Sequence, residues 1–398
     1  MTSKPPFGGE VVRLGDVCEV VGGATPKTSE PAYWDGGIKW VTPAEISDNT
    51  YILEDTAKHL TEAGFRSASL HMMPAGTVLL TTRAPIGKVA LAGTEMCCNQ
   101  GFKCLVCSDA VSNEWLYRYL KHRAPQLQTM GTGATFKELS KRAVVNLEIV
   151  LPSLDDQLAA VHKLAGVEQV MAILGQQFAK LDELVKSRFV EMFGDADALM
   201  SGWPKMPLAA CVNSIDSGKS VNCKSEARTG SAPGVLKLSA LSSGKYLPEE
   251  NKAMFDGESV LPGKEVVIGD ILVARKNTPD LVGACVMVDC DAPNLMFPDL
   301  VFRMHPIAGV DGTYLSILLG QSSFSETVRS LAHGSAKSMS NIPKSELGKL
   351  EIPFPPLALQ REFADFAARV DKLRVEAQAQ KEKLQTLYDS LAQDYFAI

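Results

Sequence analysis

The sequence predicts an α+β fold in which two similar globular domains alternate with two long α-helices. The first observation is a repeat: the 63 residues of Gly131–Phe193 recur as Gly334–Phe396, without a gap and with 16 identities. The second is a heptad pattern in the later part of that repeat. The third is a series of strand-like runs between Gly and Pro turns in the segments before each copy. A repeat of this length carries a whole domain, so the chain is a duplicated protein.

Length and composition agree with two soluble domains. The 398 residues exceed what one hydrophobic core usually serves. A hydrophobic content of 45% with 22% charged residues is ordinary for a folded, soluble chain. We therefore expect a globular domain at 1–152, a helix at 153–198, a second globular domain at 199–355 and a second helix at 356–398.

The first globular domain is predicted to be rich in strands. Gly76–Leu91 has the pattern of a β-hairpin with Arg83 and Lys88 near its tip. Asn113–Arg123 has helical spacing of its apolar residues. The run Leu147–Leu151 is typical of a closing strand.

A long helix is predicted from Leu154. Ser153 can cap its first turn, and Asp155 and Asp156 suit the positive end of the helix dipole. Apolar residues then recur at alternating spacings of four and three, which predicts pairing with a second helix. These residues are Val167, Met171, Leu174, Phe178, Leu181 and Val185. About 40 residues at 1.5 Å each give a rod of roughly 60 Å.

The second half repeats this plan with different contents. Gly269–Lys276 corresponds to Gly76–Arg83, and the turn after it, Asn277–Gly283, is longer. In the second helix the expected pairing residues are Leu384, Leu387 and Leu391.

The net charge of −6 does not point to a nucleic-acid binder until it is divided along the chain. Residues 154–198 carry 4 basic and 8 acidic side chains, whereas residues 1–153 carry 15 of each. Residues 206–353 carry 14 basic and 16 acidic side chains. Near-neutral globular halves permit a local basic surface without demonstrating one.

Nine cysteines in a chain that begins with no signal-like segment argue against a disulfide framework. Cys104 and Cys107 form a C-x-x-C, but they lie on a predicted strand, where residues three apart point to opposite faces. We therefore favour buried structural thiols over zinc. No apolar run approaches the roughly 20 residues of a membrane span, so a cytoplasmic location is expected.

Motifs of enzymes are incomplete in this chain. Gly218-Lys219-Ser220 ends like a phosphate-binding loop, but Asn213 stands where the first glycine is required, so a surface turn is favoured. The six histidines are scattered, with no pair at metal-ligand spacing. The chain is expected not to be an enzyme by itself.

The repeated block carries a family resemblance. GTGATFKELSKRAVVNLEIVLPSLDDQ and HGSAKSMSNIPKSELGKLEIPFPPLALQRE share the motif L-x-I-x-x-P-x-L-x-x-Q, with a long helix after each. Together with GTVLLTTRAPIGKVAL, GDILVARKNTP and Asn99-Gln100-Gly101, they resemble the specificity (S) subunits of type I restriction–modification enzymes. The resemblance covers essentially the whole chain. Departures are Ala358-Leu359, where the family often has acidic residues, and the long turn Asn277–Gly283.

The resemblance implies a fold and a function. The globular parts would be two target recognition domains, each reading one half of a gapped DNA target. The helices would pair as an antiparallel coiled coil with pseudo-two-fold symmetry and set the spacing between the half-sites. Two methyltransferase subunits would dock on the chain and bind S-adenosylmethionine, and endonuclease subunits would join them. The chain itself would bind no cofactor or metal and catalyse no reaction.

Candidate DNA-contacting residues follow from residue type and position. Arginine and lysine at turn tips suit phosphate or guanine, and side-chain amides suit adenine. The candidates are Arg83, Lys88, Asn99, Gln100, Thr132, Thr135, Lys137, Arg275, Lys276, Ser335 and Lys337. The alternative is that each is a solvated surface residue, or in the case of Asn99 a turn former.

Two other functions compete with this hypothesis. One is a scaffold that binds only proteins through its β-rich domains and its helical rod. The other is a self-contained nuclease or methyltransferase.

Overall fold

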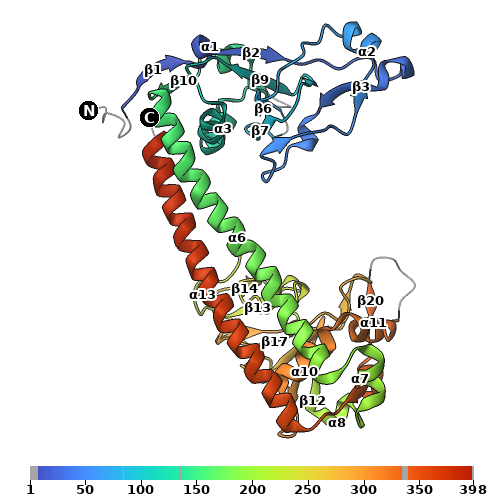
Figure 1. The fold of residues 1–398 in the computed structure, drawn as a ribbon. Coiled ribbons are helices and arrows are strands. Elements are labelled where there is room, and N and C mark those ends of the chain that lie inside the picture. Colours follow the sequence, from blue (N-terminus) through green and yellow to red (C-terminus); the bar gives the residue numbers. More distant parts are fainter. Residues whose placement is uncertain (1–7, 84, 134–136, 334–338, 397–398) are drawn as a thin grey trace. The chain divides into compact units, whose positions relative to one another are not determined.

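A computed structural model describes residues 8–83, 85–133, 137–333 and 339–396 (Figure 1). The chain forms two compact units: unit 1 is Met1–Gly175 with Gln378–Ile398, and unit 2 is Gln176–Ala377. Each unit combines one β-rich globular part with the start of one long helix and the end of the other. The predicted α+β fold is confirmed.

Unit 1 contains a five-stranded sheet in the order β2-β9-β6-β7-β4 and a three-stranded sheet in the order β5-β3-β8. A third, two-stranded sheet pairs β1 with β10 antiparallel. The strands are β1 (Glu10–Arg13), β2 (Cys18–Gly22), β3 (Trp34–Val41), β4 (Ile52–Leu53), β5 (His59–Leu60), β6 (Val78–Thr81), β7 (Val89–Ala92), β8 (Cys97–Cys98), β9 (Phe102–Cys107) and β10 (Glu148–Leu151). The short helices are α1 (Leu14–Val17), α2 (Glu62–Ser67), α3 (Asn113–His122), α4 (Ala124–Met130) and α5 (Lys141–Val145).

The core of unit 1 explains why these segments fold as they do. β6 and β7 are apolar apart from Thr81 at the end of β6, and all their residues are buried because both faces of the sheet are covered. The predicted hairpin between them is confirmed. α3 begins at its cap Ser112 and buries the face that helical spacing predicts, including Trp115 and Tyr119.

Unit 2 repeats this plan with one strand fewer in its main sheet and an additional two-stranded sheet of β16 and β20. Its four-stranded sheet has the order β12-β19-β15-β17, its three-stranded sheet has the order β14-β13-β18, and β11 pairs with β21. The strands are β11 (Lys205–Pro207), β12 (Val212–Ser217), β13 (Gly234–Leu236), β14 (Asn251–Ala253), β15 (Ile271–Ala274), β16 (Lys276–Asn277), β17 (Cys285–Met287), β18 (Leu295–Met296), β19 (Val301–Pro306), β20 (Ser340–Asn341) and β21 (Glu351–Pro353). The short helices are α7 (Ala196–Gly202), α8 (Leu208–Cys211), α9 (Ser239–Ser242), α10 (Gly312–Gly320), α11 (Ser322–Ser330) and α12 (Lys344–Lys349).

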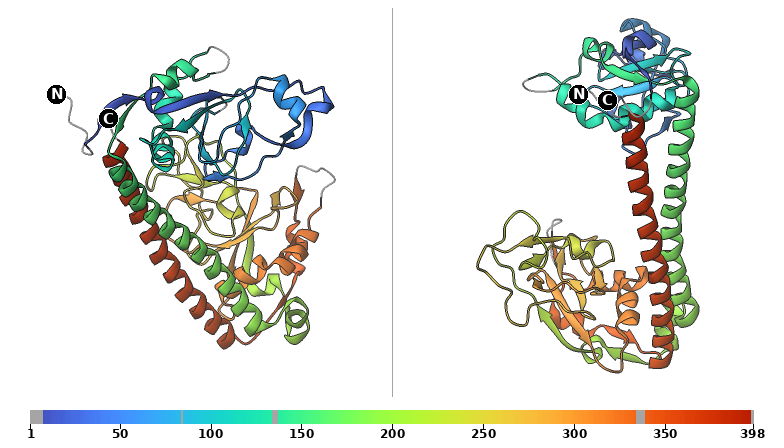
Figure 2. Two further views of the ribbon diagram at one scale, coloured as in Figure 1. Left: turned by 45° about the horizontal axis from the view of Figure 1, so that its top comes forward. Right: turned by 90° about the vertical axis from the view of Figure 1, so that its left-hand side faces the viewer.

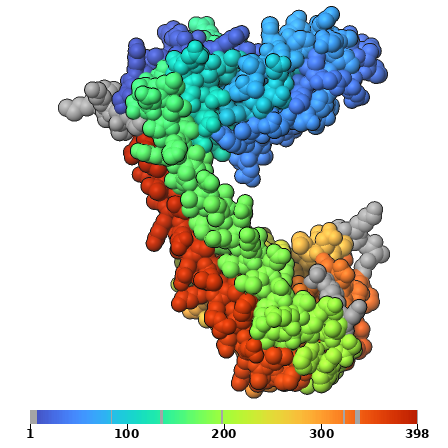
Figure 3. All heavy atoms as spheres, in the orientation of Figure 1, coloured from blue at the N-terminus to red at the C-terminus, as the bar shows by residue number. Residues whose placement is uncertain are grey.

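The long helices are α6 (Leu154–Phe193) and α13 (Leu357–Phe396), and their bounds differ by the same 203 positions as the sequence repeat. Glu168 of α6 bonds Tyr388 of α13 in unit 1. In unit 2, Arg188 bonds Glu362 at 3.1 Å. Because the partner number falls as the α6 number rises, the helices are antiparallel. The two helices run side by side in both ribbon views of Figure 2, and their atoms adjoin in the space-filling view of Figure 3.

A buried or half-buried stripe follows the heptad positions of α6. It contains Val167, Met171, Leu174, Phe178, Leu181 and Val185, and most residues between them are exposed. On α13, Leu384 and Leu391 are half-buried, whereas Leu387 is 47% exposed.

The stretch Leu154–Gly202 is long and apolar enough, by length and composition, to cross a membrane, with a mean hydropathy of 1.3 over 18 residues. Only 22% of that window is buried. The expectation that no apolar run approaches the length of a membrane span is therefore wrong for this stretch. The heptad stripe accounts for part of this composition, since a paired helix also carries an apolar side.

A buried glutamine fixes the start of each long helix to the globular part before it. Gln157 accepts a hydrogen bond from the Ser112 backbone N–H at 2.9 Å and donates to the carbonyls of Ala110 and Pro152 at 3.0 Å. In unit 2, Gln360 accepts from the Asp311 N–H at 2.9 Å and donates to a proline carbonyl. Ser112 and Asp311 cap α3 and α10. Both amides are fully buried. We call this arrangement the glutamine clip.

A contact between two short helices, α1 and α5 in unit 1 and α8 and α12 in unit 2, recurs with the larger and smaller residues exchanged between the helices. A Cβ on Gly15 of α1 would lie 2.6 Å from Val145 Cγ1 in α5. In unit 2 the corresponding residues are Ala209 and Gly348, so the larger and smaller side chains have changed places.

We predict that Gln157→Ala lowers the free energy of unfolding by about 2–4 kcal/mol, because it leaves buried backbone groups without partners. Urea unfolding measures this. Gln169→Ala, at an exposed glutamine on the same helix, is the matched control and should change stability by less than about 0.5 kcal/mol. Equal effects of the two substitutions would contradict the clip.

Gly15→Ala should destabilise by about 1–3 kcal/mol through the clash with Val145. Adding Val145→Gly recreates the pair found in unit 2, so the double variant should be more stable than the sum of the single effects predicts. Gly166→Ala in α6 meets no atom within 4 Å and should be neutral or stabilising. If the stability effects of Gly15→Ala and Val145→Gly simply add, the two positions are not coupled and the proposed exchange of side-chain sizes is wrong.

Candidate nucleic-acid interface

Three loops meet beside the end of β6 in unit 1 and of β15 in unit 2. In unit 1 the Thr82 N–H donates to the Gly101 carbonyl at 2.7 Å, and the Thr82 carbonyl accepts from Leu139 N–H at 3.1 Å. In unit 2 Arg275 makes the same two backbone bonds, to Leu300 at 2.9 Å and from Ile342 at 2.8 Å. Most candidate residues lie on or beside these loops.

A fourth loop joins them, and only glycine fits its closest approach. A Cβ on Gly23 would lie 2.1 Å from the Cys98 carbonyl oxygen, and one on Gly218 would lie 2.1 Å from that of Pro298. The stretch Gly218–Ser220 is thus irregular backbone that lies directly against a neighbouring loop. We call the four loops together the loop edge: residues 23–25, 82–83, 99–101, 132–133 and 137–138 in unit 1, and 218–220, 275–276, 298–300 and 339–341 in unit 2.

Arg83 is ion-paired at the loop edge of unit 1. Its guanidinium donates to Glu138 at 2.7 Å, and Lys103 lies 3.6 Å from the same carboxylate. The hydrogen bond from Arg83 holds the pKa of the Glu138 carboxyl below its usual range, against a smaller effect of burial. The positive charge of Arg83 is therefore matched by a negative charge, although its side chain is 43% exposed.

The other candidates of unit 1 differ in what their side chains do. The Asn99 carboxamide accepts a bond from the Gly101 N–H at 2.8 Å, which is the turn-forming role. Gln100 is exposed and bonds to Thr25. Lys88 is half-buried.

Thr132 and Lys137 flank the last loop of unit 1. Thr132 exchanges two backbone hydrogen bonds with Glu138, at 3.0 and 2.9 Å. Lys137 is exposed. Thr135 lies outside the described residues.

In unit 2, Arg275 is held by packing. Its guanidinium lies 4.8 Å from the centre of the Phe302 ring and donates to Asn341 at 3.3 Å. Lys276 belongs to β16, which pairs with β20 at Asn341. Ser335 and Lys337 lie outside the described residues.

Several residues at the loop edge were not predicted from the sequence. They are Thr25, Lys103, Glu138, Ser220, Asp299 and Asn341. Glu138 and Asn341 occupy matching positions of the repeat, and each meets a cation there. The repeat in the sequence shows that the two positions correspond. It does not show which cation each residue contacts.

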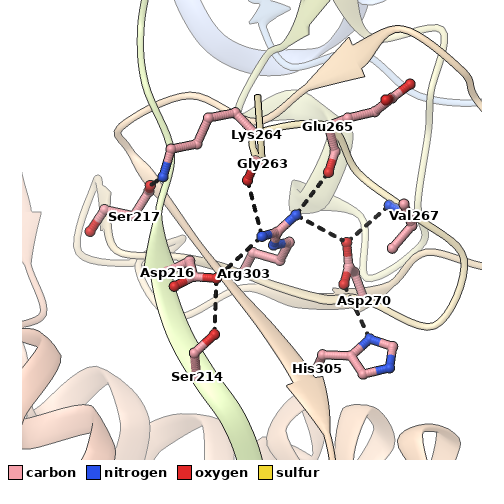
Figure 4. Close-up of polar contacts among 10 residues, drawn as sticks. All are labelled: Ser214, Asp216, Ser217, Gly263, Lys264, Glu265, Val267, Asp270, Arg303 and His305. Atoms are coloured by element: carbon pink, nitrogen blue, oxygen red, sulfur yellow. Dashed lines mark hydrogen bonds and ion pairs between the residues drawn. The ribbon is translucent and has the colours of Figure 1, made fainter. Parts of the chain in front are cut away.

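A charged network near the loop edge of unit 2 was also missed (Figure 4). Arg303 of β19 bonds Asp216 at 3.2 Å and the carbonyls of Gly263 and Glu265 at 3.1 and 2.8 Å. Asp270 lies 3.9 Å from the same guanidinium, and burial raises the pKa of its carboxyl. The network ties the loop before β15 to the sheet.

Unit 1 has an apolar cluster where unit 2 has this network. By strand register, Val21 and Cys104 stand where unit 2 has Asp216 and Arg303. Cys104 contacts Cys98 at 3.6 Å, while Cys107 contacts Cys18 at 4.0 Å, so the C-x-x-C residues turn to different partners. All nine cysteines are free thiols, and within the described residues no cluster of His, Cys, Asp and Glu forms a metal site.

Comparison with known proteins finds similarity to the specificity subunits of type I restriction enzymes. Residues 6–183 match the family described as type I restriction modification DNA specificity domain. The MjaIX specificity subunit of Methanocaldococcus jannaschii is 35% identical over 193 residues, which are 48% of this chain and 44% of that protein. The EcoEI specificity subunit of Escherichia coli is 29% identical over 196 residues, 48% of this chain and 33% of that protein. The chain thus matches less than half the length of these two relatives.

A fuller match in length comes at lower identity. The MjaVIII specificity subunit of M. jannaschii is 20% identical over 404 residues, covering 96% of this chain and 90% of that protein. The S subunit of the type I restriction–modification system from M. genitalium has a similar fold, with a TM-score of 0.55 at 13% identity over 100% of this chain and 98% of that one. A chain from a structural study of complex assembly and conformational transition of the type I R-M system gives 0.57 at 19% identity, over 98% and 97%.

Two β-rich units on a pair of long helices, each with one loop edge, define a duplicated two-site protein. The chain is similar to type I restriction–modification specificity (S) subunits, through the domain match over residues 6–183 and through the relatives named above. The resemblance noted from its sequence is confirmed.

Proposed function

We propose that this chain is the non-catalytic DNA-specificity subunit of a type I restriction–modification system. Each unit would read one half of a bipartite, gapped target in double-stranded DNA. The observation that carries this proposal is the loop edge, which recurs on one backbone frame with different side chains. Two readers of different sequences need a common frame with different contents.

The working division follows the repeat. Recognition domains would occupy 1–152 and 199–355, and the spacer helices would occupy 153–198 and 356–398. At the loop edges, or near them in the case of Lys88, we retain as DNA contacts Arg83, Lys88, Gln100, Thr132, Lys137, Arg275 and Lys276. Thr135, Ser335 and Lys337 remain candidates by sequence. Asn99 is proposed to shape its turn rather than to contact a base.

The partners would be two methyltransferase subunits, which bind S-adenosylmethionine, and endonuclease/translocase subunits. Exposed apolar side chains on the long helices support protein docking, because soluble proteins rarely expose such residues in groups. They are Leu154, Leu158, Val170, Ile173, Leu184, Val190, Leu373, Val375 and Leu387. We expect this assembly in the cytoplasm, where chromosomal DNA lies.

A scaffold that binds only proteins is the second candidate, supported by the same exposed helix residues. A competition gel shift separates the two. The chain assembled with its methyltransferase should retain one gapped duplex against excess competitor of scrambled sequence. Equal competition by scrambled DNA would favour the scaffold.

Arg83→Ala and Glu138→Gln should change DNA affinity in opposite directions. Loss of Arg83 removes a cation, so binding should weaken for all sequences and its salt dependence should fall by about one charge. Loss of the Glu138 carboxylate frees Arg83, and an exposed ion pair worth up to about 1 kcal/mol allows a gain of up to about fivefold. Glu95→Gln, at an exposed glutamate of the same unit, is the charge-matched control. A loss of affinity in Glu138→Gln would contradict this assignment.

Inserting one heptad beside Asp182 in α6 and another beside its ion-pair partner Arg374 in α13 should lengthen the preferred gap. Seven residues add roughly 10 Å of helix, which corresponds to at most about three base pairs. Selection from duplexes with gaps of different lengths measures the change. A seven-residue insertion at the exposed turn of Gly244 should leave the gap unchanged. Altered bases with an unaltered gap would contradict the spacer role.

A further inference from the structure

One hydrogen-bonded side-chain pair occupies the same place in both loop edges. In unit 1, the Thr25 hydroxyl donates to the Gln100 side-chain carbonyl. In unit 2, the Ser220 hydroxyl donates to an oxygen of the Asp299 carboxylate. Backbone hydrogen bonds show that the two pairs correspond. The Ala24 N–H, just before Thr25, donates to the Cys98 carbonyl at 3.1 Å. The Lys219 N–H, just before Ser220, donates to the Phe297 carbonyl at 3.1 Å.

The backbone positions both pairs in the same way. Close approach at Gly23 and Gly218 sets the position of the hydroxyl two residues later. The hydroxyl then orients the side chain that it bonds. A fixed donor or acceptor is what discrimination between bases requires, since a mobile group would satisfy any partner.

The chemistry differs between the two copies, although the frame does not. With its carbonyl bonded to Thr25, the Gln100 carboxamide presents its amino group, and the side chain is exposed. Asp299 offers only acceptors, and its bond to Ser220 uses the oxygen Oδ1 and not Oδ2. Glutamine suits adenine in the major groove, whereas a carboxylate accepts from the amino group of cytosine.

An arginine lies at or next to the backbone contact beside each pair. In unit 1, Gly101 follows Gln100 and bonds Thr82, the residue before Arg83. In unit 2, Leu300 follows Asp299 and bonds Arg275 directly. An arginine that contacts phosphate sets the register of a protein on the duplex, while a neighbouring side chain reads the base.

We propose that Gln100 and Asp299 are the equivalent specificity-determining residues of the two units, with Gln100 selecting adenine and Asp299 selecting cytosine. Thr25 and Ser220 are the positioning residues that orient them. This inference rests on the proposed DNA-reading function and assigns its residues.

The test is selection of randomised duplexes by the full chain assembled with its methyltransferase. Gln100→Asp should change the preferred base at one position of one half-site from adenine to cytosine, by about tenfold in preference, and leave the other half-site intact. Asp299→Gln should make the reverse change in the other half-site. Gln126→Asp, at an exposed glutamine of unit 1 away from the loop edge, should alter neither.

Thr25→Val separates the positioning role from the reading role. It should keep the preferred base but lower its preference several-fold, because the carboxamide is no longer oriented. An unchanged consensus in Gln100→Asp and Asp299→Gln, or a uniform loss of affinity for all sequences, would overturn the assignment of these residues. No consensus in the unmodified assembly would instead overturn the proposed function.

Discussion

The glutamine clip is the interaction on which the rest of the architecture depends. If a flexible joint connected the start of a long helix to the globular part before it, the orientation of that part relative to the helix would not be fixed. Gln157 and Gln360 remove that freedom, because one buried amide bonds the helix start, the preceding chain and the cap of a short helix together. Buried polar groups are costly unless fully paired, and here that cost enforces one geometry.

The duplicated frame shows which parts of each unit are free to vary. Strand order and the backbone bonds around β6 and β15 are shared, whereas the side chains on them are exchanged. An apolar cluster with Cys104 in unit 1 stands where Arg303 and its charged partners brace unit 2. Either solution satisfies the buried groups, so the interior tolerates different contents while the loop edge keeps its shape.

Local and periodic signals in the sequence predicted much of the fold. The repeat, the heptads and the Gly and Pro turns placed α6, α13 and the hairpin of β6 and β7. Side-chain partners distant in sequence were not predictable in this way. The sequence indicates that Arg83 is an exposed cation, whereas in the structure Arg83 bonds Glu138, 55 residues later, at 2.7 Å. Asn99 carries a side chain suited to adenine, yet its own turn uses it.

The most direct test of a two-reader protein is a map of methylated adenines in a genome that carries this chain with its partner methyltransferase. The account predicts one motif composed of two short specified half-sites separated by a gap of constant length. A single contiguous motif, or methylation that does not depend on this chain, would contradict it.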